Sequence, residues 1–399
     1  MTVDPLSVVE VPAADVHKAG RLAGRLTRTR DGVVFSYLDG YDGPPVATTL
    51  PRGADPVLRP GGALPAFFTG LLPEGRRLGA LRRAVKTSVD DELSLLLAVG
   101  DDTIGDVQVV PTGAAPVRLP ARVELDPSRP VRFRDLLTEL DLHPDRTGLP
   151  GIQEKVSAVM INLPAARAGH ALILKLDPPE YPGLVENEAV LLRACAASGL
   201  ATAAADLVRD VDGAAGLAVV RFDRVPGPAG LQSCALEDGC QVQGRAPGDK
   251  YTVGYAATFT ALAAVCDARL LAARTLLAQL VFAVITGNGD AHAKNFSVLQ
   301  QPDGEWRVSP AYDVPTSQPY GDTTLAMPVN GRRSDAGAAD VVALGAAIGL
   351  PEAASRRVLR TAVERVDAWL PLLDALPYDT GRRRELVRVI RQRQRRLTP

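Results

Sequence analysis

Hydrophobic positions along the chain follow three patterns, which divide it into three zones. In the first zone, residues 1–125, the apolar run Gly32–Tyr37 predicts a strand. Between residues 64 and 102, apolar residues recur at helical spacing between glycine and proline breaks, which predicts short helices. The proline-rich stretch Pro111–Pro130 predicts a linker or an edge segment. We therefore expect an N-terminal α/β subdomain.

The second zone, residues 126–225, mixes strands with one helix. Short apolar runs at Ala171–Leu176 and Leu217–Phe222 predict strands, and Asn187–Ser198 has helical spacing and is followed by a glycine. We expect Asn187 to cap this helix at its N-terminus. Glu188 would then lie in the first turn, where the helix dipole favours a negative charge.

The third zone, residues 226–399, is predicted to be mostly helical. One hairpin interrupts it, with strands at Phe296–Leu299 and Trp306–Val308. The helix-period segments are Tyr255–Val265, Leu270–Thr286, Ala338–Gly349, Ala353–Leu370 and Arg382–Leu397. A mixed lobe followed by a helical lobe predicts an α+β chain, and kinase-like folds have this layout.

Composition limits the classes of protein to be considered. The chain has 399 residues, of which 46% are hydrophobic, enough for two or three packed units. The net charge of -1 predicts no general attraction to nucleic acid or to anionic membranes. The chain begins without the pattern of a signal peptide, and its longest apolar stretch, Leu276–Ile285, is too short to span a bilayer.

The four cysteines also indicate a cytoplasmic protein. They form no CxxC pair, and no histidine lies at metal-binding spacing beside them. We therefore expect four reduced thiols, and a zinc site is a remote alternative. These cysteines are Cys195, Cys234, Cys240 and Cys266.

The segment Thr286–Ser297, with the sequence TGNGDAHAKNFS, contains the strongest indication of chemistry. Phosphoryl transfer to a hydroxyl needs a carboxylate near the attacking oxygen and oxygen ligands for Mg²⁺, and protein kinases place these as Asp-x-x-x-x-Asn. Asp290 and Asn295 have that spacing, after a strongly apolar helix and before a short hairpin. Lys294, between them, could face the γ-phosphate. The segment therefore predicts a catalytic loop.

A second aspartate follows the hairpin. Asp313 ends the segment PAYD and would meet the same metal from the other side. Valine and proline follow it, so the DFG tripeptide of protein kinases is absent. Taken singly, Asp290 and Asp313 could be turn residues and Asn295 a cap. Their order around a hairpin favours the functional interpretation.

A lysine upstream fits the same chemistry. Lys175 interrupts the apolar strand Ala171–Leu176, where a charge needs a partner or a ligand. In kinases such a lysine binds the α- and β-phosphates and is held by a glutamate of the next helix. Glu188 is the expected partner, and Glu186 is the second candidate. The alternative is a lysine at a strand end that extends into solvent.

Two further segments could take part in nucleotide binding. Arg221 and Asp223 follow a strand and could lie in a hinge between lobes, or could belong to a surface salt-bridge cluster. The segment Thr147–Ser157 contains Gly148 and Gly151. It lacks the G-x-G-x-x-G pattern, so by pattern alone it predicts only a turn before a strand.

These segments, in this order, resemble the HipA toxin kinase family. The resemblance rests on GIQEK, ILKL, the helix that begins with NE, VVRFDR, GNGDAHAKNFS and PAYD. The N-terminal segments FFTGLLPEG and LLLAVGDDTIGDV also resemble that family's amino-terminal subdomain. The resemblance covers about residues 20 to 370. It implies a bilobal protein-kinase-like fold with a helical C-terminal lobe.

The resemblance implies roles for individual residues. Asp290 looks like the catalytic base, Asn295 and Asp313 look like Mg²⁺ ligands, and Lys175 looks like the lysine that binds the phosphates of ATP. The family's phosphate loop matches Gly151, Gln153, Glu154 and Lys155. ATP and Mg²⁺ are the implied cofactors.

The resemblance also implies partners. Members phosphorylate serine or threonine of proteins, including aminoacyl-tRNA synthetases, and so arrest translation. A HipB-type helix-turn-helix antitoxin usually binds them and tethers them to operator DNA. Family members often carry a serine three residues before the loop glycine and autophosphorylate it. Gly148 stands at that position, with Thr147 adjacent and Ser157 further on, so we expect weak or absent inhibitory autophosphorylation.

The C-terminal run Arg382–Arg396 contains eight arginines and one glutamate. It could be the solvated face of a terminal helix, or could contact DNA or an acidic partner. Two alternative functions also stay open: a small-molecule phosphotransferase of the same fold, and a catalytically silent subunit of a DNA-binding repressor complex. The first would not be expected to match the first 110 residues.

Overall fold

The chain folds into two units, each assembled from separate segments of the sequence. The structure is a computed structural model that describes residues 8–9, 11–117, 121, 123–126, 128–129, 131–139, 160–227 and 230–399. Unit 1 comprises residues 1–120, 223–250 and 298–306, and unit 2 comprises residues 121–222, 251–297 and 307–399. Each predicted zone is one continuous stretch of sequence, whereas each unit combines several separate stretches. The division into three domains stays a prediction.

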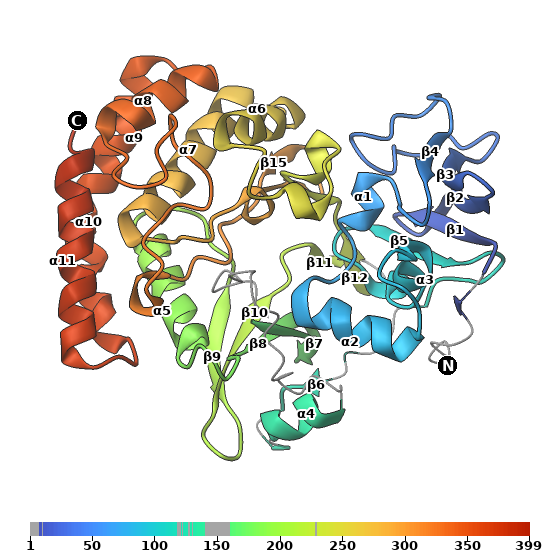
Figure 1. Ribbon diagram of the computed structural model, residues 1–399, viewed down its shortest axis with the longest axis horizontal. Coiled ribbons are helices and arrows are strands. Elements are labelled where there is room, and N and C mark those ends of the chain that lie inside the picture. The colour runs from blue at the N-terminus through green and yellow to red at the C-terminus, as the bar shows by residue number, and fades with distance from the viewer. Residues whose placement is uncertain are drawn as a thin grey trace. The chain divides into compact units, whose positions relative to one another are not determined.

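Unit 1 is built on a five-stranded antiparallel sheet in the order β4-β3-β2-β1-β5 (Figure 1). The predicted strand Gly32–Tyr37 is confirmed as β3. Its first residue must be glycine, because a Cβ atom there would lie 1.8 Å from the carbonyl oxygen of Arg59 on β4. The predicted short helices are also present. The first part of unit 1 consists of β1 (Ala13–Lys18), β2 (Arg21–Thr29), β3 (Gly32–Tyr37), β4 (Val57–Pro60), α1 (Ala66–Thr69), α2 (Gly75–Val85), α3 (Glu92–Leu97), the 3-10 helix η2 (Gly100–Asp102) and β5 (Val107–Pro111).

Later segments of the chain complete unit 1. Short strands lie between residues 224 and 238, in a zone predicted to be mostly helical, so that prediction is wrong there. The predicted hairpin is present. Its first strand lies one residue later than predicted and its second strand lies as predicted, and the first strand pairs with one of these strands in the order β13-β14-β15. These elements are β11 (Arg224–Gly227), β12 (Gly230–Ser233), β13 (Leu236–Asp238), η4 (Gln241–Gln243), η5 (Pro247–Asp249), β14 (Ser297–Gln300) and β15 (Trp306–Val308).

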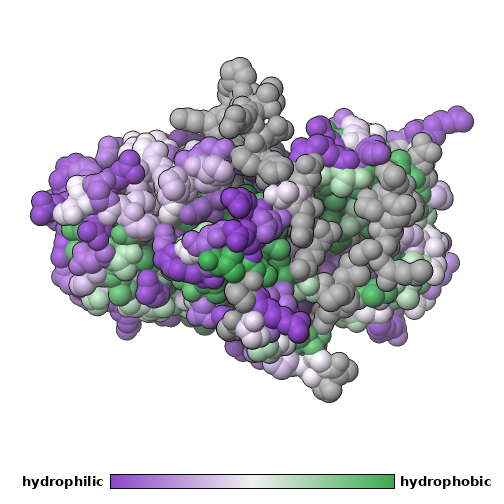
Figure 2. Space-filling view, turned by 90° about the horizontal axis from the view of Figure 1, so that it is seen from below, coloured by the Kyte–Doolittle hydropathy of each residue, from purple (hydrophilic) through white to green (hydrophobic). Residues whose placement is uncertain are grey.

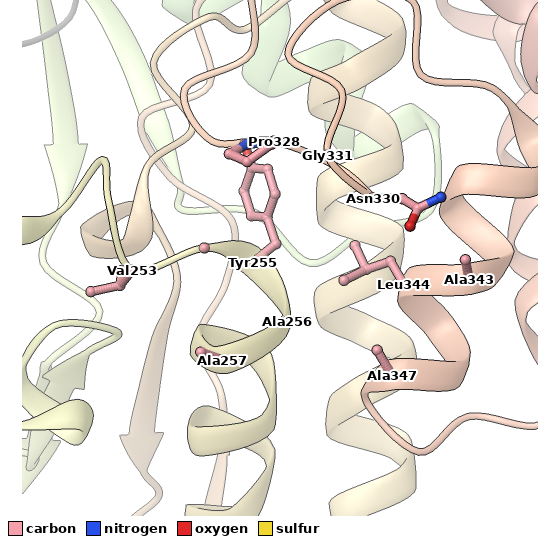
Figure 3. Close-up of a pocket in the computed structure, with 11 residues that line it drawn as sticks. Val253, Tyr255, Ala256, Ala257, Pro328, Asn330, Gly331, Ala343, Leu344 and Ala347 are labelled. Carbon is pink, nitrogen blue, oxygen red and sulfur yellow. The ribbon is translucent and has the colours of Figure 1, made fainter.

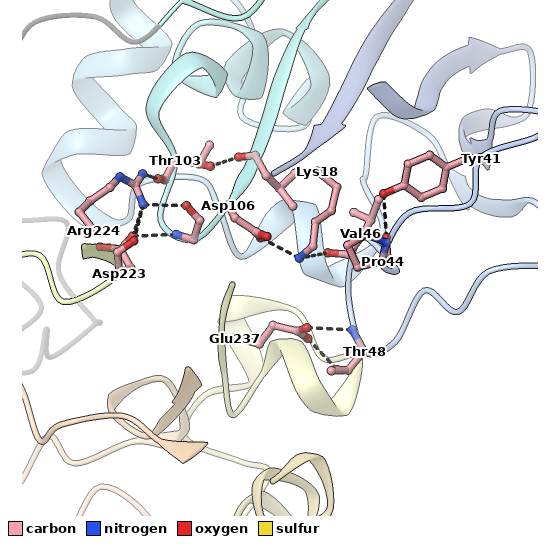
Figure 4. A network of polar contacts seen from close by, with 12 residues as sticks. Lys18, Tyr41, Pro44, Val46, Thr48, Thr103, Asp106, Asp223, Arg224 and Glu237 are labelled. Carbon is pink, nitrogen blue, oxygen red and sulfur yellow. Dashed lines mark hydrogen bonds and ion pairs between the residues drawn. The ribbon is translucent and has the colours of Figure 1, made fainter. Parts of the chain in front are cut away.

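Buried polar groups link the two parts of unit 1 (Figure 4). Lys18 on β1 forms an ion pair with Asp106 at 2.7 Å and donates to the carbonyl of Val46. Glu237 on β13 accepts from the backbone N–H and the hydroxyl of Thr48, at 2.8 and 2.7 Å. All three charged groups are at least nine-tenths buried. The Lys18 contacts lie within the N-terminal segment, and the hydrogen bonds from Thr48 to the buried Glu237 fix β13 against that segment.

Unit 2 begins with a second sheet, in the order β6-β7-β8-β10-β9. The predicted strands at 171–176 and 217–222 are confirmed, although the second ends two residues earlier than expected. The helix α5 connects β8 to β9 and packs on β9 and β10 (Figure 1). The elements are β6 (Val123–Glu124), α4 (Phe133–Glu139), β7 (Ile161–Arg167), β8 (His170–Leu176), α5 (Leu184–Ala197), β9 (Ala205–Arg209) and β10 (Ala215–Val220).

The remainder of unit 2 is helical, as predicted. The helix α7 is its core and contacts α6, α8, α9 and α11. The predicted helix Ala353–Leu370 is broken at Arg365, because Val366 and Trp369 turn into the core and Trp369 packs edge-on against Phe282 of α7. These elements are α6 (Tyr255–Val265), α7 (Arg269–Thr286), η6 (Ala293–Asn295), η7 (Gln318–Tyr320), α8 (Ala338–Ala347), α9 (Glu352–Glu364), α10 (Val366–Trp369), η8 (Leu370–Ala375) and α11 (Thr380–Leu397).

Among the described helices, α7 is long and apolar enough to cross a membrane by length and composition, and no other passes that test. Most of it, 67%, is buried inside the protein. Its apolar residues face other helices of the same unit, as in a core helix.

We expect Glu237→Gln to stabilise unit 1 at pH 8 but not near pH 4.5. Burial raises the pKa of Glu237 above its ordinary value of 4.5, against the lowering effects of Thr48 and Lys18. A raised carboxyl pKa contributes stability at low pH, and this contribution is lost as the pH rises through the folded-state pKa. Glutamine stays neutral, and the Thr48 hydroxyl can accept from its amide. A gain of about 1 kcal/mol would raise Tm by roughly 2–4 °C.

Thermal unfolding at both pH values measures this effect. Glu305→Gln, at an exposed position of the same unit, is the control and should show no such pH-dependent gain. An equal gain in stability at both pH values would contradict the prediction that the ionised carboxylate of Glu237 destabilises unit 1.

Candidate active site

The predicted catalytic loop follows directly from the end of α7. The helix ends at Thr286 because Gly287 takes the left-handed conformation, with φ 75°, and its N–H closes onto Ala283. The side chain of Asn288 then accepts from the backbone N–H of Asp290 at 3.0 Å, which fixes a tight turn. Asp290 is 2% exposed, so its carboxylate is held at a defined place inside unit 2.

Asp313 lies against this loop, as the motif predicted. The Asn295 amide donates to one of its carboxylate oxygens at 2.7 Å, and Lys175 donates to the other at 3.2 Å. The amide of Asn288 donates to the backbone carbonyl of Asp313. Asp313 has φ 57°, an uncommon conformation for a residue with a side chain. These contacts from β8 and from two positions of the catalytic loop stabilise that conformation.

The hydroxyl of Tyr312 adds a further contact between the two segments. It donates to the carbonyl of Lys294 at 2.6 Å and also lies 2.6 Å from the hydroxyl of Ser297. The residue before Asp313 therefore contacts the middle of the short helical turn that contains Asn295 and the first residue of the strand that follows it.

Lys175 is the centre of the charged site. It lies on β8, is 8% exposed, and donates to both carboxylate oxygens of Glu188 at 2.7 and 2.8 Å. The structure therefore brings together the predicted lysine, its predicted partner on the next helix, and Asp313. The second candidate, Glu186, instead pairs with the exposed Arg209.

The electrostatics of this cluster favour the ionised lysine. Burial alone would lower the pKa of Lys175, but the carboxylates of Asp313 and Glu188 outweigh it and raise that pKa. Burial and the charge of Asp313 raise the pKa of Glu188, against the lowering effect of Lys175. We infer an ion pair, because both oxygens of Glu188 accept from the ammonium and a neutral acid could not do this equally well.

The start of α5 differs from the prediction. The helix begins at Leu184, so Asn187 is not its cap, and Glu188 lies beyond the first turn. The cap comes from Asp177, whose carboxylate accepts from the N–H groups of Gly183 and Val185 at 2.7 Å. Asp177 lies upstream of the left-handed Gly183, whereas a capping side chain usually belongs to the residue directly before the helix. The usual sequence pattern of a helix cap therefore does not identify Asp177.

Asn187 has a different role, which the sequence did not reveal. It is fully buried, and its side chain pairs with both backbone groups of Thr316, donating to the carbonyl at 2.8 Å and accepting from the N–H at 3.1 Å. It also donates to the hydroxyl of Tyr378 at 3.0 Å. Thus α5 binds Lys175 through Glu188 and the segment after Asp313 through Asn187.

Two tyrosines beside the loop were also missed. The hydroxyl of Tyr251 donates to Asp290 at 2.7 Å, and its ring meets His292 edge-on. The hydroxyl of Tyr255 donates to the carbonyl of Ala291 at 2.8 Å. No local pattern distinguishes them from core aromatics, because the partners lie some 40 residues away, at separations of 39 and 36.

Comparison with known proteins places this geometry in a family. A model of the HipA-like C-terminal domain matches residues 147–370, and a model of the HipA N-terminal domain matches residues 14–110. Y4mE of Sinorhizobium fredii is 32% identical over 363 residues, which cover 83% of this chain and 85% of that protein. The chain belongs to the HipA family.

Further HipA proteins resemble the chain over most of its length. The serine/threonine-protein kinase toxin HipA of Shewanella oneidensis is 26% identical, over 82% of this chain and 80% of that protein. A solved complex of HipA, HipB and operator DNA from S. oneidensis MR-1 contains a chain with a TM-score of 0.75 and 24% identity, and the match covers 96% of both chains. The predicted bilobal kinase-like fold is thereby confirmed.

Several predicted site residues belong to a part of the chain that the structure does not describe. Gly151, Gln153, Glu154 and Lys155 of the HipA phosphate loop lie outside the described residues, as do Thr147, Gly148 and Ser157. Their roles stay predictions.

The predicted hinge residues fall on either side of the point where the chain passes from unit 2 to unit 1. Arg221 is a buried residue of unit 2, and Asp223 belongs to unit 1. The carboxylate of Asp223 accepts from the N–H of Gly105 and pairs with Arg224 at 2.7 Å, as Figure 4 shows. Asp223 is 2% exposed, so the alternative of a surface salt-bridge cluster does not hold for this residue. Nucleotide binding by Arg221 or Asp223 stays a prediction.

Asn295 and Asp313 fit the needs of a magnesium ion. Within the described part of the chain, no group of three or more His, Cys, Asp or Glu side chains is placed to hold a metal by itself. Mg²⁺ in nucleotide-dependent enzymes usually binds to one or two carboxylates together with substrate phosphates. Asp313 would supply the carboxylate, and the Asn295 side chain, whose oxygen accepts here from the N–H of His292 at 3.0 Å, would turn that oxygen toward the metal, with the nucleotide supplying the rest.

The arginine-rich segment forms most of α11. Hydrophilic side chains gather at the left end of the molecule in Figure 2, the end at which Figure 1 shows α11. Leu386, Ile390 and Leu397 are buried. Six of the eight arginines contact acidic or carbonyl groups of unit 2: Arg382, Arg383, Arg388, Arg391, Arg393 and Arg396. Contact with DNA or with an acidic partner stays a prediction.

We expect Asn187→Leu to lower the free energy of unfolding by about 2–4 kcal/mol. The leucine would leave the buried N–H and carbonyl of Thr316 without partners, and each such group costs roughly 1–3 kcal/mol. Tyr378→Phe removes only one of the three hydrogen bonds of Asn187 and should cost about 1 kcal/mol. Urea unfolding of both variants measures the difference, and equal losses would show that the pairing with Thr316 contributes little.

Proposed function

We propose that this HipA-family chain is an ATP-dependent protein serine/threonine kinase that acts as the toxin of a toxin–antitoxin pair. The observation that supports this most directly is the arrangement of Lys175, Glu188, Asn295 and Asp313 beside the buried Asp290. Each of these side chains has the chemistry that phosphoryl transfer requires, and the likeness to HipA proteins covers most of the chain.

In this proposal the residues have separate tasks. Asp290 accepts the proton of the attacking hydroxyl, and Lys175, held by Glu188, binds the α- and β-phosphates. Asn295 and Asp313 would hold Mg²⁺, which would neutralise charge on the phosphates. Lys294 lies in the loop between base and metal ligand, where its charge could face the γ-phosphate.

The hydrogen bonds around these groups support a preorganised site. Tyr251 donates to one oxygen of Asp290 at 2.7 Å and so helps to hold this carboxylate in place. Asn288 and Tyr312 fix the loop and the segment of Asp313 to each other. Such positioning is the main contribution of a protein to phosphoryl transfer, because little covalent chemistry falls to the enzyme.

The proposed partner is a HipB-type helix-turn-helix antitoxin, and operator DNA would be bound mainly through it. The solved S. oneidensis complex, which contains HipA, HipB and operator DNA, supports this. The proposed substrate is a translation-related protein such as an aminoacyl-tRNA synthetase. The match to the HipA N-terminal domain, residues 14–110, argues against a small-molecule phosphotransferase.

We expect Asp290→Asn to reduce phosphoryl transfer by about 100- to 10,000-fold, because loss of a general base costs that much. Transfer from γ-labelled ATP to proteins of a dephosphorylated bacterial lysate measures it. Asp303→Asn, at an exposed hairpin turn, is the matched control and should keep full activity. Wild-type activity of Asp290→Asn would contradict the assigned role, and an inactive wild type would favour the silent repressor subunit.

We expect Lys175→Met to abolish stabilisation by ATP·Mg²⁺. A ligand at about 100 times its Kd stabilises a protein by about 2.7 kcal/mol, and this shift should vanish without the lysine. The single substitution also leaves the carboxylate of Glu188 buried without its ammonium, so the variant should unfold more readily.

The double variant Lys175→Met/Glu188→Gln separates these two effects. It should recover part of the lost stability, because it leaves no unpaired carboxylate at position 188, and should still show no thermal shift with ATP·Mg²⁺. A normal shift in either variant would make Lys175 a structural residue only.

A further inference from the structure

A pocket of about 370 Å³ lies in unit 2 beside the catalytic loop. Its walls are the start of α6, one face of α8 and the loop at residues 328–331, and Figure 3 shows Tyr255 and Leu344 on opposite sides of it. All eleven residues that line it are uncharged, and most are alanine, glycine or aliphatic residues. The chemistry of the walls therefore selects an apolar group.

Tyr255 connects this pocket to the candidate active site. Its ring forms part of the wall, and its hydroxyl reaches the carbonyl of Ala291, the residue after Asp290. The segment that forms this wall begins two residues after Tyr251, whose hydroxyl donates to Asp290. The length of one tyrosine side chain therefore separates the pocket from the catalytic loop. An extended peptide would cover that distance in about three residues, at about 3.3 Å per residue.

We propose that this pocket binds an apolar side chain of the protein substrate, about three residues from the hydroxyl that is phosphorylated. This inference rests on the proposed kinase function and defines a substrate class for it. Asn330 provides the only polar side chain of the lining besides the Tyr255 hydroxyl, which is bonded to Ala291. A free small molecule needs several polar groups to orient it. A side chain tethered to the phosphorylated residue does not, because the tether already limits its position.

Two exposed alanines on α8 allow a sharp test. Ala347 lines the pocket, and the adjacent Ala346 is equally exposed but does not line it. Ala347→Trp should fill the pocket, and Ala346→Trp should leave it open while adding the same bulk to the same helix. Since both side chains face solvent, neither change should affect folding, and thermal unfolding checks this.

The probe is a dephosphorylated, protease-digested bacterial proteome, in which phosphorylated peptides are identified by mass spectrometry. For the wild type, phosphosites should be enriched in apolar residues at one position within about four residues of the phosphate. A matched pair of peptides, with leucine or serine at that position, should differ roughly 10- to 100-fold in kcat/KM. Ala347→Trp should lose this difference while its ATP hydrolysis without peptide stays unchanged, and Ala346→Trp should behave as wild type.

Three results would overturn the inference while leaving the kinase function intact. These are phosphorylation without apolar enrichment, transfer to folded proteins but to no peptide, and equal effects of the two tryptophan variants. A change of oligomeric state in Ala347→Trp alone would assign the pocket to a contact between copies of the chain instead. Failure of the proposed function is distinct, because the wild type would then transfer phosphate to neither peptides nor folded proteins.

Discussion

The charge of Lys175 inside an apolar sheet is the constraint on which the rest of unit 2 depends. An ammonium group that is 8% exposed cannot stay there without anionic partners, and Glu188 and Asp313 supply them from two other segments. The strand β8, the helix α5 and the segment of Asp313 must therefore come together, because only then are the charges of Lys175, Glu188 and Asp313 paired. The ion pair that stabilises the fold also holds the Lys175 ammonium at a fixed position, and phosphate binding would need the ammonium to be fixed in the same way.

The helix α5 shows how one element can set the position of two others. Asn187 and Glu188 are neighbours in sequence, and successive side chains on a helix point about 100° apart, since a turn holds about 3.6 residues. Glu188 faces β8, while Asn187 faces Thr316, three residues beyond Asp313. A shift of α5 would therefore disturb Lys175 and the segment of Asp313 together. Tyr378 adds the segment before α11 to the same arrangement.

The sequence predicted those features that local spacing determines. The helices α6 and α7, the strands β3 and β8, and the motif that contains Asp290 and Asn295 each depend on residues a few positions apart. The pairings of Asn187 with Thr316 and of Tyr251 with Asp290 join residues 129 and 39 positions apart, and no periodicity indicates them. The strand β13 escaped for a related reason, because it pairs with the distant β14. The capping of α5 by Asp177 is local but lacks the usual cap spacing.

Unit 1 cannot be divided at the end of its N-terminal segment without loss of buried contacts. The match to the HipA N-terminal domain ends at residue 110, yet residues 223–250 belong to the same unit. Arg224 donates to Asp102 and to the carbonyls of Thr103 and Gly105, and Glu237 accepts from Thr48. A fragment that ended near residue 110 would lose these buried partners, and each unpaired polar group costs roughly 1–3 kcal/mol. Unit 1 is therefore a folding unit only together with the later segment, although the sequence places more than 100 residues between them.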